Sequence, residues 1–162
     1  MSDILTIATE SVSGGELPTK LLGSRGEAIA AKYLIENGYR LVMSNFIVPV
    51  GRNRRGAQVT GEIDIVALDG DTLCFIEVKT RRSEEFTPII TAVDIRKQRQ
   101  ITRTARIYRR IFGVFDMAHR FDVVTVLIPD GELPTIELVK GLWAESKFRK
   151  LSWQRQIQQN YI

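Results

Sequence analysis

The spacing of hydrophobic and polar positions changes several times along the chain, and each change predicts a new element. Apolar residues recur at helical spacing after Gly23, form strand-like runs after Gly38, and return to helical spacing in the second half. Gly, Pro and Asp residues separate these stretches. The predicted elements are a helix between Ser24 and Gly38, a strand at 39–50, a hairpin at 61–80, a helix at 93–112, and strands at 119–128 and 135–139. This order predicts an α/β fold in which helices flank a mixed β-sheet.

The first predicted helix carries an acidic residue in an unusual place. Ser24 and Glu27 fit a capping box at its start, and Gly38 fits its end. Glu27 then shares a helical stripe with Ala31 and Leu34, which faces the core. A carboxylate on a buried stripe needs a reason, so Glu27 is a candidate site residue.

The length of 162 residues predicts one domain with a single core. Residues 1–20 predict a flexible N-terminal arm, residues 21–142 the domain itself, and residues 143–162 a C-terminal helix or tail. No run reaches the roughly 18 apolar residues that a membrane span needs. The first residues lack the basic and apolar regions of a secretory signal, so we expect a cytoplasmic protein.

Charge and cysteine content narrow the possible chemistry. The net charge is +4 and the pI is near 9.4, which suggests a polyanionic partner. The single Cys74 and the single His119 exclude a zinc site built from Cys and His within one chain. Any metal ion must therefore be a hard cation held by carboxylates.

The predicted hairpin carries three charged residues in apolar runs: Asp64, Glu77 and Lys79. Side chains alternate along a strand, so Glu77 and Lys79 share a face. A two-residue loop puts Asp64 on that face too, whether the loop is Asp69-Gly70 or Gly70-Asp71; the second register sets Asp64 opposite Glu77. Only a three-residue loop would separate them.

Two carboxylates on one face repel each other and need compensation, from Lys79 or from a divalent cation. The simpler interpretation is a solvent-exposed face. The apolar neighbours of Asp64 and Glu77 favour burial instead, because strands this apolar are usually covered on both sides. The pattern then indicates a Mg²⁺ or Mn²⁺ site for phosphodiester hydrolysis, where Lys79 orients or deprotonates a water molecule or stabilises charge on a phosphate.

The spacing of these residues resembles the PD-(D/E)xK signature of restriction endonucleases and Holliday-junction resolvases. Four segments in order also resemble the YraN-type family of small bacterial proteins, which belongs to that superfamily: residues 26–34, 61–64, 75–81 and 120–124. The resemblance covers residues 22–128 and implies a restriction-endonuclease-like core, hence a nuclease-like domain. It implies that Asp64, Glu77, Glu27 and the carbonyl of Val78 are metal ligands and that Lys79 is the catalytic lysine.

The second long helix is strongly basic, with seven basic and no acidic residues between positions 96 and 110. Five arginines at spacings of three and four form one stripe: Arg96, Arg99, Arg103, Arg106 and Arg110. This stripe is either a ridge that contacts phosphates or a solvated face. Arg81 and Arg82, after the hairpin, are further candidates for nucleic-acid binding, and the loop with Arg52, Arg54 and Arg55 is the alternative surface.

Other polar residues have mainly structural interpretations. Asp122 is expected to pair with Arg120 or a backbone group, with a role in the site as the alternative. Cys74 should face away from Glu77 into the core, and His119 is expected to be incidental. Lys97 and Gln98, at the start of the basic helix, could reach the metal site.

These features together predict a metal-dependent nuclease that acts on DNA, with branched or recombining DNA as one candidate substrate and RNA still open. Two alternatives remain. One is a non-catalytic nucleic-acid-binding module with the same fold, and the other is an adaptor that binds an acidic protein through the basic helix. The presence of Asp64, Glu77 and Lys79 together favours the enzyme.

Overall fold

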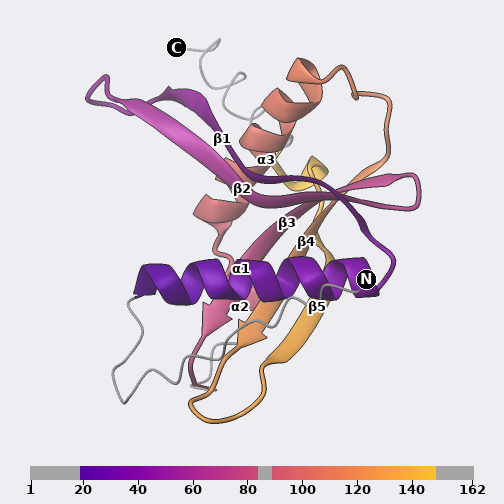
Figure 1. Ribbon diagram of the computed structural model, residues 1–162. Coiled ribbons are helices and arrows are strands. Elements are labelled where there is room, and N and C mark those ends of the chain that lie inside the picture. Colours follow the sequence, from indigo (N-terminus) through magenta and orange to yellow (C-terminus); the bar gives the residue numbers. More distant parts are fainter. Residues whose placement is uncertain (1–18, 84–88, 149–162) are drawn as a thin grey trace, which may run out of the picture.

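The computed structural model describes residues 19–83 and 89–148 (Figure 1). Its elements are α1 (Thr19–Glu36), β1 (Arg40–Arg52), β2 (Gln58–Asp69), β3 (Thr72–Arg81), α2 (Ile89–Ala92), α3 (Ile95–Ile111), β4 (His119–Leu127) and β5 (Thr135–Trp143). The predicted order of elements is confirmed, with the short α2 as an addition. Most of the predicted N-terminal arm and of the C-terminal segment lies outside the described residues.

The five strands form one mixed sheet in the order β1-β2-β3-β4-β5. Neighbouring strands are antiparallel except β3 and β4, which run parallel and are connected through α2 and α3. In Figure 1, α1 crosses in front of the sheet and α3 lies beyond it. The fold is therefore the predicted α/β arrangement, a mixed sheet between helices that agrees with a restriction-endonuclease-like core.

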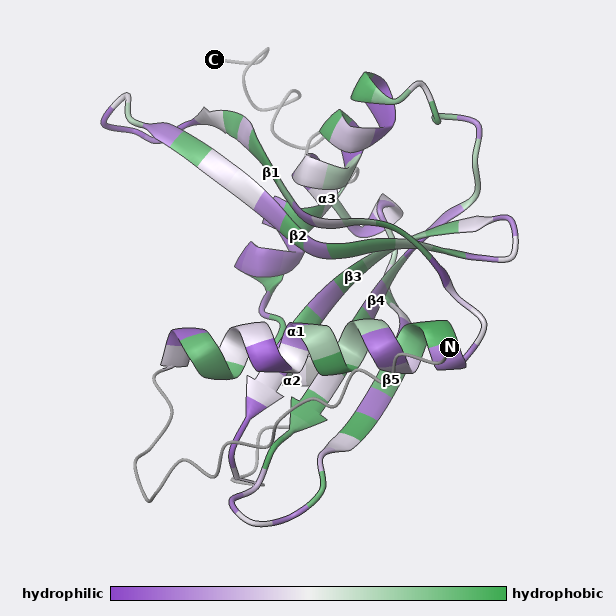
Figure 2. Ribbon diagram, in the orientation of Figure 1, coloured by the Kyte–Doolittle hydropathy of each residue, from purple (hydrophilic) through white to green (hydrophobic). Residues whose placement is uncertain are grey.

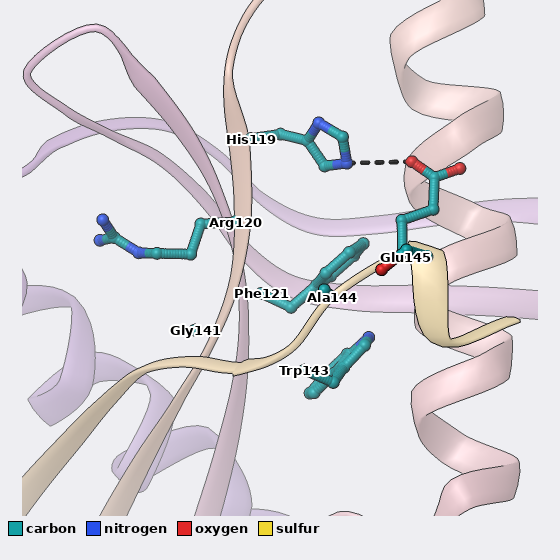
Figure 3. Close-up of a pocket in the computed structure, with 8 residues that line it drawn as sticks. His119, Arg120, Phe121, Gly141, Trp143, Ala144 and Glu145 are labelled. Atoms are coloured by element: carbon teal, nitrogen blue, oxygen red, sulfur yellow. Dashed lines mark hydrogen bonds and ion pairs between the residues drawn. The ribbon is translucent and has the colours of Figure 1, made fainter. Parts of the chain in front are cut away.

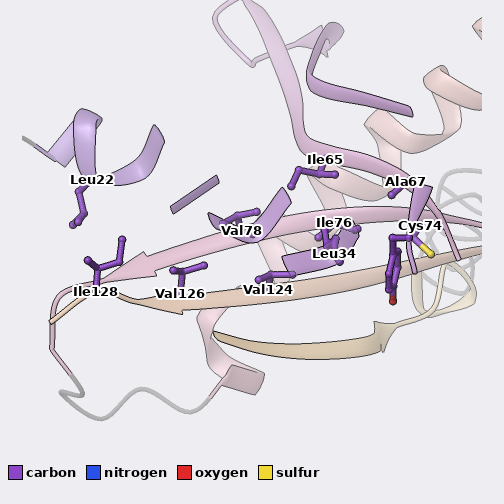
Figure 4. Packing of buried hydrophobic residues seen from close by; sticks show 12 residues of the cluster. Leu22, Leu34, Ile65, Ala67, Cys74, Ile76, Val78, Val124, Val126 and Ile128 are labelled. Atoms are coloured by element: carbon purple, nitrogen blue, oxygen red, sulfur yellow. The ribbon is translucent and has the colours of Figure 1, made fainter. Parts of the chain in front are cut away.

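Each face of the sheet has its own hydrophobic cluster. On the α1 face, Leu34 packs among residues of the central strands such as Ile76 and Val124 (Figure 4). On the α3 face, Ile101 belongs to a cluster with Val123 and several aromatic residues: Phe75, Tyr108, Phe121 and Trp143. The adjacent Val123 and Val124 thus pack on opposite faces of the sheet. Burial of both faces explains why the central strands are apolar throughout. Cys74 is buried on the α1 face, as predicted.

The β2–β3 hairpin adopts the second of the two predicted registers. Asp69 pairs with Thr72 around a Gly70-Asp71 loop, in which Gly70 has a φ of 59°. Backbone pairing continues as far as Ile65 and Ile76. The next step of this register sets Asp64 opposite Glu77, at the point where the two strands stop pairing.

Helix α1 corrects one prediction. It begins at Thr19 rather than after Ser24, so the predicted capping box is wrong. Ser24 lies inside the helix, and its Oγ donates to the carbonyl of Lys20 at 3.2 Å. Gly38 does end the helix, with a φ of 86°.

Strands β1 and β2 form a hairpin that extends beyond the rest of the sheet, and its tip is hydrophilic (Figures 1 and 2). Asn53 organises the tip, because its Oδ1 accepts from the amides of Arg55 and Ala57 at 2.9 and 3.0 Å. A register shift between Pro49 and Gly51 adds a bulge near this end.

No helix in residues 19–83 and 89–148 is long and apolar enough to cross a membrane.

Candidate functional site

Glu77 lies near the end of β3, only 2% exposed, and meets two lysines. Lys79 Nζ is 2.8 Å from Glu77 Oε1, and Lys97 Nζ, from the first turn of α3, is 3.3 Å from the same oxygen. Glu77 Oε2 is buried and has no hydrogen-bond partner within the described part of the chain. One carboxylate oxygen is therefore neutralised, while the other points at no donor.

Asp64 is the second buried carboxylate of the site. Its Oδ2 accepts a hydrogen bond of 2.7 Å from the amide of Val78, just where β2 and β3 cease to pair through their backbones. Burial and the charge of Glu77 raise the pKa of Asp64 to about 7, although the bond from Val78 works in the opposite direction. The surroundings of Asp64 therefore favour its neutral, protonated form more than water does.

Glu27 approaches from α1. It is half-buried and lines a pocket of about 300 Å³ together with Asp64 and with Ser44 and Asn45 of β1. Burial raises the pKa of Glu27, and a hydrogen bond with Asn45 lowers it in part. Glu27 and Asp64 thus meet at one pocket, and Glu27 lies beside the buried stripe of α1, whose members are Leu22, Gly26, Ala30 and Leu34.

Asn45 was missed by the sequence reasoning. It has a φ of 52°, the one positive value among the non-glycine residues that the structure describes. Asparagine tolerates this left-handed conformation better than most residues, which was the only available signal. The conformation is a local distortion of β1 opposite Asp64, since the neighbours Ser44 and Phe46 pair with Ile65 and Ile63.

The fit of this site to a divalent cation rests on two carboxylates rather than three. Within residues 19–83 and 89–148, no group of three or more His, Cys, Asp or Glu side chains is arranged to hold a metal ion. Asp64 and Glu77 do fit one, because they repel each other and Glu77 Oε2 lacks a partner. Mg²⁺ is often bound by one or two carboxylates, with waters and substrate phosphate completing its shell.

Of the two residues expected from the start of α3, only Lys97 reaches the site. Gln98 turns away: its Nε2 donates to the carbonyl of Val93 at 2.8 Å, and its Oε1 accepts from Lys147 at 3.0 Å. Consecutive helical residues point about 100° apart, so only one of them can face Glu77. Asp94 caps this turn by accepting from the Lys97 amide at 2.7 Å.

The predicted arginine stripe is not one uniform ridge. Arg106 pairs with Glu145, which follows β5, and the same carboxylate lies 3.3 Å from Arg109. The sequence reasoning found no acid to neutralise this helix because Glu145 lies 39 residues beyond Arg106. The C-terminal half of the stripe is therefore partly neutralised.

The other members of the stripe have different surroundings. Arg103 donates to the carbonyl of Val50 at 2.8 Å, and the Arg99 guanidinium lies 5.7 Å from the Phe148 ring centroid. Arg96 and Arg110 are exposed. Two further candidates, Arg81 and Arg82, lie half-buried at and just after the end of β3.

A second pocket, of about 470 Å³, lies between the start of β4, the end of β5 and the segment that follows β5 (Figure 3). His119 Nε2 lies 3.1 Å from Glu145 Oε2, and Phe121 stacks on Trp143 with centroids 4.9 Å apart. Burial lowers the pKa of His119, and the charge of Arg109 adds to this effect. His119 and Arg109 thus share the carboxylate of Glu145, a contact that ties the start of β4 to the segment after β5.

Asp122 has the predicted structural role. It is fully buried, and Arg120 donates to both of its carboxylate oxygens at 2.7 and 2.9 Å. The Gly141 amide adds a third bond at 2.8 Å. Arg120 also bonds Asp69 and the Tyr39 hydroxyl, so this cluster connects β2, β4 and the start of β1.

Comparison with known proteins places the chain in a family. The model of the uncharacterised protein family UPF0102 matches residues 26–126, a range that includes Glu27, Asp64, Glu77, Lys79 and Lys97. A UPF0102 protein of Geobacter sulfurreducens is 42% identical over 126 residues, which cover 78% of this chain and 91% of that protein. A second, of Renibacterium salmoninarum, is 39% identical over 121 residues, or 75% and 94% of the two chains.

Similarity to solved structures is looser. The crystal structure of SSO0001 has 18% sequence identity and a TM-score of 0.37, over 90% of this chain and 63% of that one. The sequence matches alone decide the assignment, since they extend over most of the chain at about 40% identity. The chain belongs to the UPF0102 family, the YraN-type members of the restriction-endonuclease-like superfamily.

Proposed function

We propose that the protein is a Mg²⁺- or Mn²⁺-dependent nuclease that hydrolyses phosphodiester bonds in DNA. The observation that carries this proposal is Glu77, which is buried beside Asp64, meets two lysines through one oxygen and has no partner for the other. Buried polar atoms are nearly always paired, so an unpaired carboxylate oxygen suggests a ligand that completes it. A divalent cation would satisfy Glu77 Oε2 and relieve its repulsion with Asp64.

The residues divide the expected chemistry between them. Asp64, Glu77 and the carbonyl of Val78 would hold the ion, and Glu27 would face it across the pocket that it shares with Asp64. The bound ion supplies Lewis-acid activation of a water molecule and of the scissile phosphate. Lys79 can orient the attacking water, and Lys97 can donate to a non-bridging phosphate oxygen, where negative charge grows as the water attacks phosphorus.

The test is cleavage of single-stranded, duplex, flap and four-way DNA with Mg²⁺ or Mn²⁺. Wild-type protein should cut at least one of these substrates, whereas Glu77→Gln and Lys79→Ala should bind DNA without cutting. Lys32→Ala is the matched control, because Lys32 lies on α1 with its side chain 79% exposed. Full activity in Glu77→Gln would point to a contaminating nuclease or a different site.

A non-catalytic DNA-binding module is the second candidate. It is favoured by the absence of a ready three-carboxylate cluster within the described residues, and by the two lysines that already neutralise one Glu77 oxygen. On this alternative, calorimetry would detect no Mg²⁺ or Mn²⁺ binding to the wild type, and DNA would bind without being cut under any metal.

A further inference from the structure

The β1–β2 hairpin and α3 share a strongly basic character. Residues 47–61 contain three arginines, Arg52, Arg54 and Arg55, and no acidic residue, and all three arginines are exposed. Helix α3 adds seven basic residues and again no acidic one. Figure 2 shows hydrophilic colour at the hairpin tip and along parts of α3. A surface of this kind attracts a polyanion.

Helix α3 braces both strands of the hairpin. Gln100 Nε2 donates to the carbonyl of Thr60 on β2 at 2.7 Å, and Arg103 donates to the carbonyl of Val50 on β1. Thr104 packs so closely on Gly61 that a Cβ there would lie 2.0 Å from the threonine Oγ1. The hairpin is therefore held in place relative to α3.

The same contacts give the direction in which the arginines of α3 point. Arg96 and Arg103 are seven residues apart, close to two full turns, so their side chains leave the helix in nearly the same direction. Arg103 and Gln100 show that this direction faces the hairpin. Arg96 lies in the same first turn of α3 as Lys97, whose ammonium group contacts Glu77, although the two side chains leave the helix about 100° apart.

Five exposed arginines lie on α3 and the hairpin that it braces, and we call them the arginine track: Arg96, Arg103, Arg52, Arg54 and Arg55. The track covers about 10 Å along α3, at 1.5 Å per residue, and about 10 Å along the hairpin, at 3.3 Å per residue. One DNA strand carries a phosphate about every 3.4 Å of duplex axis, so each of these two parts spans about three phosphates. Beyond Arg103, Glu145 neutralises Arg106 and Arg109, and Arg110 lies at the end of α3 farthest from Lys97.

We infer that the arginine track binds the phosphate backbone of duplex DNA and leads it to the Asp64–Glu77 site. This inference rests on the proposed function in taking DNA as the partner, and it adds where the duplex lies. A braced hairpin offers arginines at fixed spacing, which suits the regular phosphates of a duplex. Since phosphate contacts carry no sequence information, binding along the track should be independent of sequence.

The test compares two double variants that remove the same charge. Arg54→Gln/Arg55→Gln alters the tip of the track, and Lys32→Gln/Arg40→Gln removes an exposed lysine of α1 and an exposed arginine at the start of β1, both of which lie off the track. Binding of a labelled 24-base-pair duplex is measured by fluorescence anisotropy in EDTA at several salt concentrations. Two lost phosphate contacts should reduce the slope of log K against log salt by about 1.8 and weaken binding on the order of 50-fold at 0.1 M salt. The off-track variant should keep the wild-type slope.

Three results would overturn the inference: a wild-type slope in Arg54→Gln/Arg55→Gln, equal losses in both double variants, or displacement of the duplex by polyglutamate as effectively as by unlabelled DNA. Arg54→Lys/Arg55→Lys should retain the slope, which separates lost charge from a damaged hairpin. Binding in EDTA does not depend on cleavage. If the slope changes as expected but the protein cuts no DNA, the inference about the arginine track stands and the proposed nuclease activity fails.

Discussion

At the scale of single residues, Glu77 is the group around which the other charged residues of the candidate site lie. Two ammonium groups share its Oε1, and Asp64 lies near enough to repel it. Burying two carboxylates together is unfavourable unless cations compensate both. Lys79 and Lys97 compensate part of this charge, and burial together with the charge of Glu77 raises the pKa of Asp64, which favours its neutral form.

This arrangement predicts a pH dependence of stability without divalent ions. Folded Asp64 has a pKa of about 7, whereas the ordinary value is 3.8, so the folded state binds the proton more tightly. The stability that this proton contributes is fully present below about pH 4 and is lost as pH rises through about 7. Urea unfolding in EDTA at pH 5, 6, 7 and 8 should therefore give a falling free energy of unfolding. Asp64→Asn should flatten that fall, and a slope unchanged by this substitution would contradict the assignment.

Arg120 allows a second prediction at this scale. Replacing Arg120 with Ala leaves the fully buried Asp122 without its bidentate partner, so the free energy of unfolding should drop by about 3–5 kcal/mol. Lys140→Ala is the control. Lys140 pairs with Asp69 in the same cluster, but its side chain is 51% exposed, so its loss should cost about 1 kcal/mol or less. Urea denaturation measures the free energy of unfolding of both variants. Equal losses would show that the effect of Arg120→Ala does not come from the buried charge of Asp122.

Which of these residues could be predicted depends on how local their contacts are. Asp64, Glu77 and Lys79 come from one hairpin, so strand alternation and a two-residue turn were enough to predict that they share a face. Glu145 reaches Arg106 from a distant segment, and no short-range pattern reports such a contact.

At the scale of elements, the two long helices α1 and α3 each approach the sheet closely at a glycine. Gly26 of α1 lies against Thr80 of β3, one residue before Glu27 and one after Lys79, so this contact sets the spacing between helix and site. The helical period of α1 was predicted, but its start was placed too late, because Ser24 and Glu27 fit a capping box. The buried stripe in fact begins with Leu22, one turn before Gly26. The four-residue α2 is too short for any helical period to show.

Gly26→Ala should therefore separate α1 from β3. The added Cβ would lie 1.8 Å from Thr80 Oγ1, and relieving that overlap should lower the free energy of unfolding by about 1–3 kcal/mol. Gly23→Ala is a matched control on the same helix. A Cβ there meets nothing within 4 Å, so this substitution should stabilise the protein by up to about 1 kcal/mol. Thermal unfolding compares the two, and adding Thr80→Ala to Gly26→Ala should restore part of the loss.

At the scale of the whole molecule, one sheet separates two hydrophobic clusters that share its central strands. Neighbouring residues of β3 and β4 project alternately into the two clusters. Unfolding of one cluster displaces these two strands, and the other cluster then loses its packing as well. Both sides should therefore belong to a single cooperative unit.

Ile65→Ala on the α1 face and Ile101→Ala on the α3 face test this coupling. Both side chains are almost fully buried, so each substitution should lower the free energy of unfolding by about 2–5 kcal/mol. Circular dichroism and the fluorescence of Trp143, measured with Trp153→Phe in every variant, should report the same single transition, since Trp143 lies in the α3-side cluster. Two transitions, or a fluorescence-detected transition that does not shift in Ile65→Ala, would show that the two faces unfold separately.

The order of the strands also bears on how the chain folds. Every strand lies beside the strand that precedes it in the sequence, so only the connection from β3 to β4, residues 82–118, must close over a long distance. Closing that connection costs the most chain entropy, and contacts distant in sequence are slow to form. Asp64 and Glu77 belong to the local β2–β3 hairpin, whereas Lys97 arrives with the connection. A refolding molecule should thus bring its two carboxylates together first and gain its second lysine only as the slowest step completes.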